Sequence, residues 1–211
     1  SNYGMTFVEY IFLNKFRKEN SHIEIKGENI LKEIEKNKKP VIFVSGHFAN
    51  FELMSMEITK KNNHLATIYR PLNNIFLNPL MEYLRLKFVC PNQIKKGRLG
   101  VKDAINYIKK GFSVALMIDQ RVSEGEKINF FGKKALTTTL PAQLAKKFNL
   151  DIVPVYLERK NKNSFFMEVY NPVLTSQLKN KTEVSLKLNT ILEEMISRNP
   201  KQWIWTHDRW K

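Results

Sequence analysis

Short apolar runs and longer amphipathic stretches alternate along this chain. Residues 41–44 and 114–118 are continuous apolar runs, which is typical of strands buried on both faces. One long stretch carries apolar side chains at helical spacing, which predicts a core-facing stripe: Val184, Leu188, Ile191, Leu192, Met195 and Ile196. Strands are predicted over 41–45, 65–69, 113–118, 152–158 and 165–170. Helices are predicted over 5–18, 28–37, 51–62, 74–87, 99–110, 139–148 and 182–198.

This alternation of strands and helices predicts an α/β fold in which a layered, mostly parallel central sheet is flanked by helices. The last two strands flank the polar turn 160–164, so a C-terminal antiparallel hairpin is expected to join the sheet. With 211 residues and no linker or repeat, a single domain over 1–211 is expected. Residues 119–138 form a long connection, and long loops inside compact domains are often functional.

Charge narrows the class of partner. Lys and Arg outnumber Asp and Glu by 35 to 20, which gives a formal net charge of +15. Such an excess favours an anionic partner: nucleic acid, phosphate-bearing lipid, an anionic membrane face or an acidic protein. A basic surface kept for solubility is the alternative. A nucleic-acid-binding module is the rival from another class, yet no RRM, KH, zinc or helix-turn-helix signature is present.

Cysteine and histidine spacing gives no sign of a metal site. Cys90 is the single cysteine, which excludes an internal disulfide and favours a reducing compartment. The histidines (His22, His47, His64 and His207) show no metal-binding spacing, so no metal is expected. No apolar run reaches the ~20 residues that span a bilayer.

The first helix has two interpretations. Val8, Ile11, Phe12 and Phe16 fall at helical spacing and are followed by basic residues. This pattern suits an interfacial helix on anionic lipid, or a helix packed on the core, and we favour the second.

The stretch VIFVSGHFANFE, residues 41–52, carries the clearest chemistry. His47 follows a buried strand, and Glu52 begins the next helix, at the carboxyl edge of the sheet where α/β proteins bind substrates. If His47 sits in the turn, Glu52 can bond one imidazole nitrogen and leave the other free as a general base. Asn50 is expected to cap the helix through its side chain. The alternative is a turn histidine beside an unrelated surface glutamate.

Two further strands are predicted to end in polar groups at the same edge. Arg70 follows the second strand and offers a planar fork for phosphate. Asp119, Gln120 and Arg121 follow the third. The loop with Lys95, Lys96 and Arg98 is another phosphate-site candidate or a solvated loop. The expected substrate-binding residues are Arg70, Asn50, Arg98, Asp119, Gln120 and Arg121.

The C-terminal residues 202–211 hold all three tryptophans, Trp203, Trp205 and Trp210, interleaved with basic side chains. Such a pattern can stack nucleobases or lie at a membrane interface. The alternative is that Trp203 and Trp205 close the core.

Five segments together resemble the bacterial lipid A biosynthesis acyltransferases of the late, lauroyl/myristoyl type. They occur in the family's order: GHFANFEL (46–53), IYRPLNN (68–74), ALMIDQR (115–121), FFGKKALTTTLPAQLA (130–145) and QWIWTHDRWK (202–211). The HxxxxE element is shared with other acyltransferases, whereas the tail together with Asp119-Gln120 is more specific. No FPEGT-like block is present, which counts against glycerol phosphate as the acceptor.

The resemblance implies a glycerolipid-acyltransferase-like fold and an O-acyltransferase activity. Acyl carrier protein, or CoA, would carry the donor thioester, and the acceptor would be a hydroxyl of an anionic phosphorylated glycolipid, a lipid A precursor. Another glycolipid or a phospholipid acceptor is the alternative. His47 matches the family base, Glu52 its partner and Arg70 a phosphate-binding arginine. No cofactor beyond the acyl donor and no nucleic acid is expected.

The resemblance also implies a place of action, the cytoplasmic face of the bacterial inner membrane. Family members usually begin with a membrane-anchoring helix, and this chain is expected to be the soluble or peripheral catalytic part without it.

Overall fold

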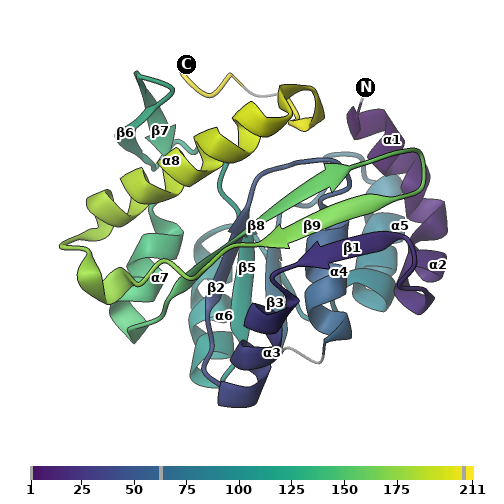
Figure 1. Ribbon diagram of the computed structural model, residues 1–211. Coiled ribbons are helices and arrows are strands. Elements are labelled where there is room, and N and C mark those ends of the chain that lie inside the picture. Colours follow the sequence, from purple (N-terminus) through teal and green to yellow (C-terminus); the bar gives the residue numbers. More distant parts are fainter. Residues whose placement is uncertain (1, 62–63, 206–207) are drawn as a thin grey trace.

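The computed structural model describes residues 2–61, 64–205 and 208–211 and contains a seven-stranded sheet (Figure 1). The strand order is β1-β9-β8-β2-β5-β3-β4. The strands are β1 Ile23–Lys26, β2 Ile42–Ser45, β3 Leu65–Tyr69, β4 Gln93–Lys95, β5 Ser113–Met117, β8 Ile152–Arg159 and β9 Phe165–Val169. All neighbours pair in parallel except β8 and β9, which form the expected C-terminal antiparallel hairpin. The predicted mostly parallel α/β sheet is therefore confirmed.

Helices cover both faces of this sheet. Figure 1 shows α7 and α8 on the left of the sheet and α1, α2, α4 and α5 on the right. Their bounds are α1 Asn2–Glu9, α2 Leu13–Lys18, α3 Glu28–Asn37, α4 Glu52–Lys60, α5 Leu77–Leu84, α6 Arg98–Lys109, α7 Leu140–Phe148 and α8 Lys181–Arg198. No helix in the described part of the chain is both long and apolar enough to cross a bilayer.

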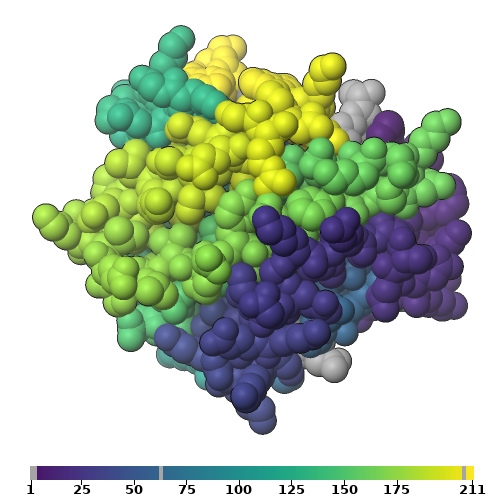
Figure 2. Space-filling model, in the orientation of Figure 1, coloured from purple at the N-terminus to yellow at the C-terminus, as the bar shows by residue number. Residues whose placement is uncertain are grey.

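The central strands and α8 follow the hydrophobic pattern closely. All four residues of β2 are buried, and so are the first four of β5, because helices cover both faces of the parallel strands. Val184, Leu188, Leu192, Met195 and Ile196 of α8 are buried as expected. Figure 2 shows α8 lying between the β6–β7 hairpin and the β8–β9 strands.

The N-terminal helix differs from the expectation. It is broken by a 3-10 turn at Tyr10–Phe12, and the buried residues of this segment include Tyr10, Leu13 and Phe16. Val8 and Ile11 of the expected core stripe are 62% and 73% exposed. The turn changes the helical phase, so that the expected stripe splits between the core and the surface.

The sequence pattern did not predict four of the strands. β1 and β4 are four and three residues long and carry only two and one apolar residues, so neither forms a continuous apolar run as β2 does. Strands β6 Glu126–Phe130 and β7 Lys133–Thr137 form a hairpin inside the predicted 119–138 loop. Their two-residue turn has Phe131 and Gly132 at φ 49° and 73°, as a type I′ hairpin turn requires.

Candidate active site

His47 and Asp119 meet at the carboxyl edge of the sheet. β2 and β5 are parallel neighbours, and their last residues, Ser45 and Met117, are register partners. Two residues beyond each strand end, His47 Nδ1 and Asp119 Oδ1 lie 2.7 Å apart. The expected convergence of polar strand ends on one edge is confirmed for this pair. The Asp119 carboxylate selects the tautomer with a proton on Nδ1, which leaves Nε2 for a substrate.

Asp119 is held by two further donors. Its Oδ2 accepts hydrogen bonds from the backbone N–H of His47 at 2.9 Å and from Trp203 Nε1 at 2.8 Å. Burial opposes ionisation, but the contacts with His47 and Trp203 prevail and lower the pKa of Asp119. Burial likewise disfavours imidazolium, yet the Asp119 carboxylate, with a smaller contribution from Glu52, raises the pKa of His47 above its ordinary 6.5. The pair is built to stabilise a proton on the imidazole.

Glu52 is not the hydrogen-bond partner of His47, which corrects the geometry expected from HxxxxE. Its Oε1 accepts from Arg85 Nε at 2.9 Å and Nη2 at 2.6 Å, and also from the Tyr10 hydroxyl. The reason is electrostatic. The buried Arg85 guanidinium is stabilised by the charge of Glu52, whereas the His47 imidazole is already paired with Asp119. Glu52 still lines the same cavity as His47, and its catalytic role stays a prediction.

Asn50 does not cap α4 through its side chain. The next residue, Phe51, holds the N-cap position of α4, and only the backbone carbonyl of Asn50 accepts a hydrogen bond, from the N–H of Leu53. The side chain is fully buried and its Nδ2 donates to Glu9 Oε2 at 2.9 Å. Asn50 is absent from the cavity lining, so the structure places it among the supports of the turn rather than at a substrate.

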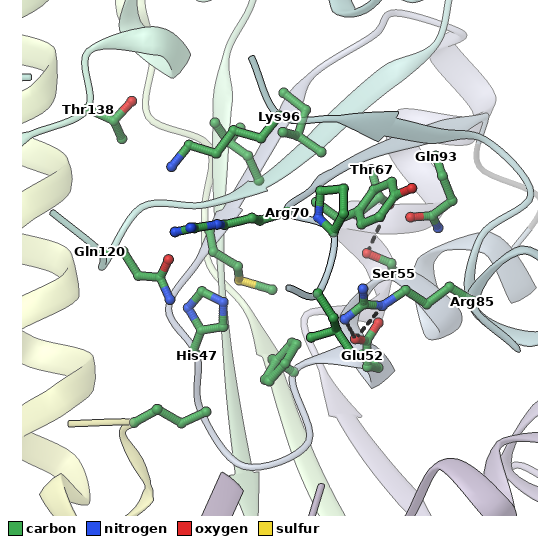
Figure 3. A pocket seen from close by; sticks show the side chains of 18 of the residues that line it. His47, Glu52, Ser55, Thr67, Arg70, Arg85, Gln93, Lys96, Gln120 and Thr138 are labelled. Carbon is green, nitrogen blue, oxygen red and sulfur yellow. Dashed lines mark hydrogen bonds and ion pairs between the residues drawn. The ribbon is translucent and has the colours of Figure 1, made fainter. Parts of the chain in front are cut away.

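A cavity of about 420 Å³ opens beside His47. Its polar wall includes Arg70, Lys96 and Gln120, and Figure 3 shows the Arg70 and Lys96 side chains reaching toward the side of the cavity occupied by His47 and Gln120. Arg70 follows β3 and Lys96 follows β4, so the polar edge extends over four adjacent parallel strands. Burial and the neighbouring Arg70 guanidinium lower the pKa of Lys96. Two cations held this close favour an anionic ligand.

The remaining predicted residues lie apart from this cavity. Arg98 is exposed at the start of α6, and Arg121 donates from Nε to the Lys211 carbonyl at 2.7 Å. Lys95 pairs with Glu82 at 3.2 Å. Among the described residues, none of these three lines the cavity.

The C-terminal tail contributes structure that spacing did not reveal. Ile204 N–H donates to the His47 carbonyl and Ala49 N–H to the Gln202 carbonyl, so the tail pairs with the turn that holds His47. Ala49 adopts φ 44°, which turns the chain toward α4. Trp203 is buried, in agreement with the core interpretation, whereas Trp205 is 58% exposed. Thr206 and His207 lie outside the described residues.

Arg209 is a second buried residue of the tail, and it packs against the β6–β7 hairpin. It is fully buried, donates to the Leu136 carbonyl and to Thr137 Oγ1, and lies over the Phe130 ring. Burial lowers its pKa to about 10, although Asp119 acts in the opposite direction. In the sequence, only the interleaving of tryptophan and basic residues over 202–211 pointed to Arg209.

Comparison with known proteins assigns the chain to a family. The family described as bacterial lipid A biosynthesis acyltransferase matches residues 1–211, the whole chain. The chain belongs to this family. Its lipid A acyltransferase relatives include the lipid A biosynthesis palmitoleoyltransferase of Escherichia coli, 26% identical over 194 residues, and the lauroyltransferase of the same organism, 24% identical over 192 residues. Each alignment covers 89% of this chain and 61% of the relative, so the chain spans about three fifths of their length.

The fold of this acyltransferase family member also resembles a solved structure. The 1-acyl-sn-glycerophosphate acyltransferase of Thermotoga maritima superposes with a TM-score of 0.54 at 13% identity, covering 94% of this chain and 81% of that one. The glycerolipid-acyltransferase-like architecture expected from the sequence is confirmed.

Proposed function

We propose that this chain transfers a fatty acyl group from a thioester on acyl carrier protein to a hydroxyl of a phosphorylated lipid A precursor. The observation that carries the proposal is the His47–Asp119 pair, 2.7 Å apart, beside a cavity with two cations in its wall. Family membership and the names of the relatives support the same acceptor class. The proposed place of action is the cytoplasmic face of the bacterial inner membrane.

The reaction follows from the geometry of the pair. Asp119 keeps the Nδ1 proton in place, and Nε2 of His47 accepts the proton of the acceptor hydroxyl. The freed oxygen attacks the thioester carbonyl carbon, a C–O bond forms and the C–S bond breaks. The imidazolium then returns its proton to the departing thiolate. No covalent enzyme intermediate and no cofactor is needed, because the thioester itself supplies the activated acyl group.

Three features of the chain bind the proposed substrates. Arg70 and Lys96 hold a phosphate of the acceptor, since a guanidinium fork and an ammonium are complementary to phosphate oxygens. The apolar residues Phe51, Leu116 and Ile204 line the same cavity as His47 and suit the start of the acyl chain. The net charge of +15 favours the acidic carrier protein.

Mass spectrometry of lipid A tests the proposal in a host that lacks its own late acyltransferase. Expression of the chain is expected to add the mass of one acyl group, and His47→Ala is expected to abolish the addition. In purified form His47→Ala should lose about 10²–10⁴-fold in kcat. His64→Ala, exposed and outside the cavity, is the matched control. An unchanged lipid A with folded wild-type protein, or full activity of His47→Ala, would overturn the proposal.

A further inference from the structure

The outward face of α5 is apolar where surface helices normally carry polar side chains. Phe76, Leu80 and Tyr83 recur at the i, i+4, i+7 spacing of one helix face and are 84%, 53% and 53% exposed. Ile75, directly before them, is 75% exposed. An exposed cluster of large apolar side chains marks an interaction surface. We call these four residues the α5 surface.

Hydrogen bonds to two asparagine side chains fix the backbone of the loop before α5. Asn74 Oδ1 accepts from the backbone N–H groups of Phe76 and Leu77, both at 3.0 Å. Asn78 Oδ1 accepts from the N–H of Leu72 at 2.8 Å. Because the backbone donors are satisfied by these two side chains, the exposure of Phe76 belongs to a defined turn.

The charges around the α5 surface favour an anionic partner. Glu82 is the only acidic residue of α5, and it is engaged by the Tyr69 hydroxyl at 2.7 Å and Lys95 Nζ at 3.2 Å. Lys87, exposed one turn beyond Tyr83, places its ammonium 5.2 Å from the Tyr83 ring centroid. Apolar side chains with a cation at their border suit the headgroup region of an anionic bilayer.

A second exposed apolar segment lies on the same side of the molecule. Val8, Ile11 and Phe12 are 62%, 73% and 46% exposed. Figure 1 shows α1, α2 and α5 on the right of the sheet, and α2 packs against the π-helical turn Arg85–Val89 that continues α5. The core is therefore covered by the inner residues of both segments, while their outer residues stay available to a partner.

The α5 surface is also continuous in sequence with the cavity. Arg70, Leu72 and Asn73 line the cavity, and Ile75 follows two residues later. We propose that the α5 surface, together with the exposed Val8, Ile11 and Phe12 of the N-terminal segment, docks on an anionic phospholipid bilayer and brings the cavity to the lipid face. This inference rests on the proposed function for the lipid nature of the acceptor, whereas docking itself is measured without catalysis.

Co-sedimentation with vesicles tests the surface directly. The wild-type chain is expected to bind phosphatidylglycerol-containing vesicles more tightly than phosphatidylcholine vesicles, with affinity falling as salt rises. Phe76→Ser/Leu80→Ser should lower the partition coefficient at least about tenfold, because it removes two inserted apolar side chains. Phe76→Ser alone, at a position 84% exposed, gives a smaller loss in the same direction without touching the core.

Leu186→Ser is the matched control, since Leu186 is 43% exposed on α8, across the sheet from α5. It is expected to bind as the wild type does. Wild-type partitioning by the double variant, or an equal loss in Leu186→Ser, would overturn the inference. Loss of acyl carrier protein binding with vesicle binding intact would overturn it too and assign the surface to a protein. Vesicle binding by a wild-type chain that transfers no acyl group would support the docking surface and refute only the proposed function.

Discussion

Trp203 and Asp119 are 84 residues apart in the chain, yet the indole Nε1–H donates to Asp119 Oδ2 at 2.8 Å. The same oxygen accepts from the backbone of His47. The other oxygen, Oδ1, is thereby directed at the imidazole. The tail tryptophan thus positions the carboxylate that bonds His47, the proposed base.

Trp203→Phe keeps most of the ring and removes this donor. We expect kcat to fall roughly ten- to a hundredfold, because one hydrogen bond to a charged group contributes roughly 1.5–3 kcal/mol. The pKa of His47 should rise, since Asp119 loses a donor that disperses its charge, and the acidic limb of the kcat/KM profile should move to higher pH. Trp205→Phe is the control, because it keeps an aromatic ring next to Trp203 and removes only the hydrogen bond that the Trp205 indole donates to the Pro200 carbonyl. Equal profiles for the two variants would contradict the positioning role.

Asp119→Asn tests the carboxylate itself. The amide cannot stabilise imidazolium, so we expect kcat to fall on the order of 10²–10⁴-fold. Asp119 raises the pKa of His47 in the wild type; its neutralisation should therefore lower that pKa and shift the acidic limb of any residual activity to lower pH. NMR titration of the imidazole measures the same shift without turnover. A rise or no change would show that Asp119 does not govern the charge of His47.

Glu52→Gln separates a structural role from a catalytic one. The substitution leaves the buried Arg85 guanidinium without its countercharge, and breaking a buried pair in this way costs about 3–5 kcal/mol. We expect urea unfolding to show a loss of this order, with the His47 pKa shifting only slightly downward. Glu33→Gln, exposed on α3, should unfold like the wild type. Unchanged stability together with a collapse of kcat would instead support the catalytic role predicted from HxxxxE.

Arg70→Lys tests the phosphate site. Lysine keeps the charge but lacks the bidentate fork, so KM for a phosphorylated acceptor should rise about tenfold while kcat changes little. For a dephosphorylated analogue, KM should be the same in Arg70→Lys as in the wild type. Arg98→Lys, outside the cavity, is the control. If Arg70→Lys weakens both acceptors by the same factor, Arg70 has a structural role only.

Hydrophobic periodicity was sufficient to predict the layered sheet and the place of the site. β2 and β5 are apolar on both faces because helices cover both sides, and this produces continuous runs that are read without knowledge of their neighbours. Parallel strands end at a common edge, so His47, Arg70 and Asp119 were expected together before their partners were known. Short strands such as β4 carry too few residues for any period to emerge.

The pairing of side chains was decided by tertiary structure alone. The expected placement of His47 in a turn and Glu52 at the start of the next helix suggested Glu52 as the partner of His47, whereas the carboxylate that bonds the imidazole is 72 residues away. Glu52 instead balances Arg85, a residue 33 positions further along the chain that no local pattern connects to it. Sequence pattern specifies which face of an element is buried, since burial depends on local periodicity. Which charged groups meet is set by strand order and helix placement, and those depend on the packing of the whole chain.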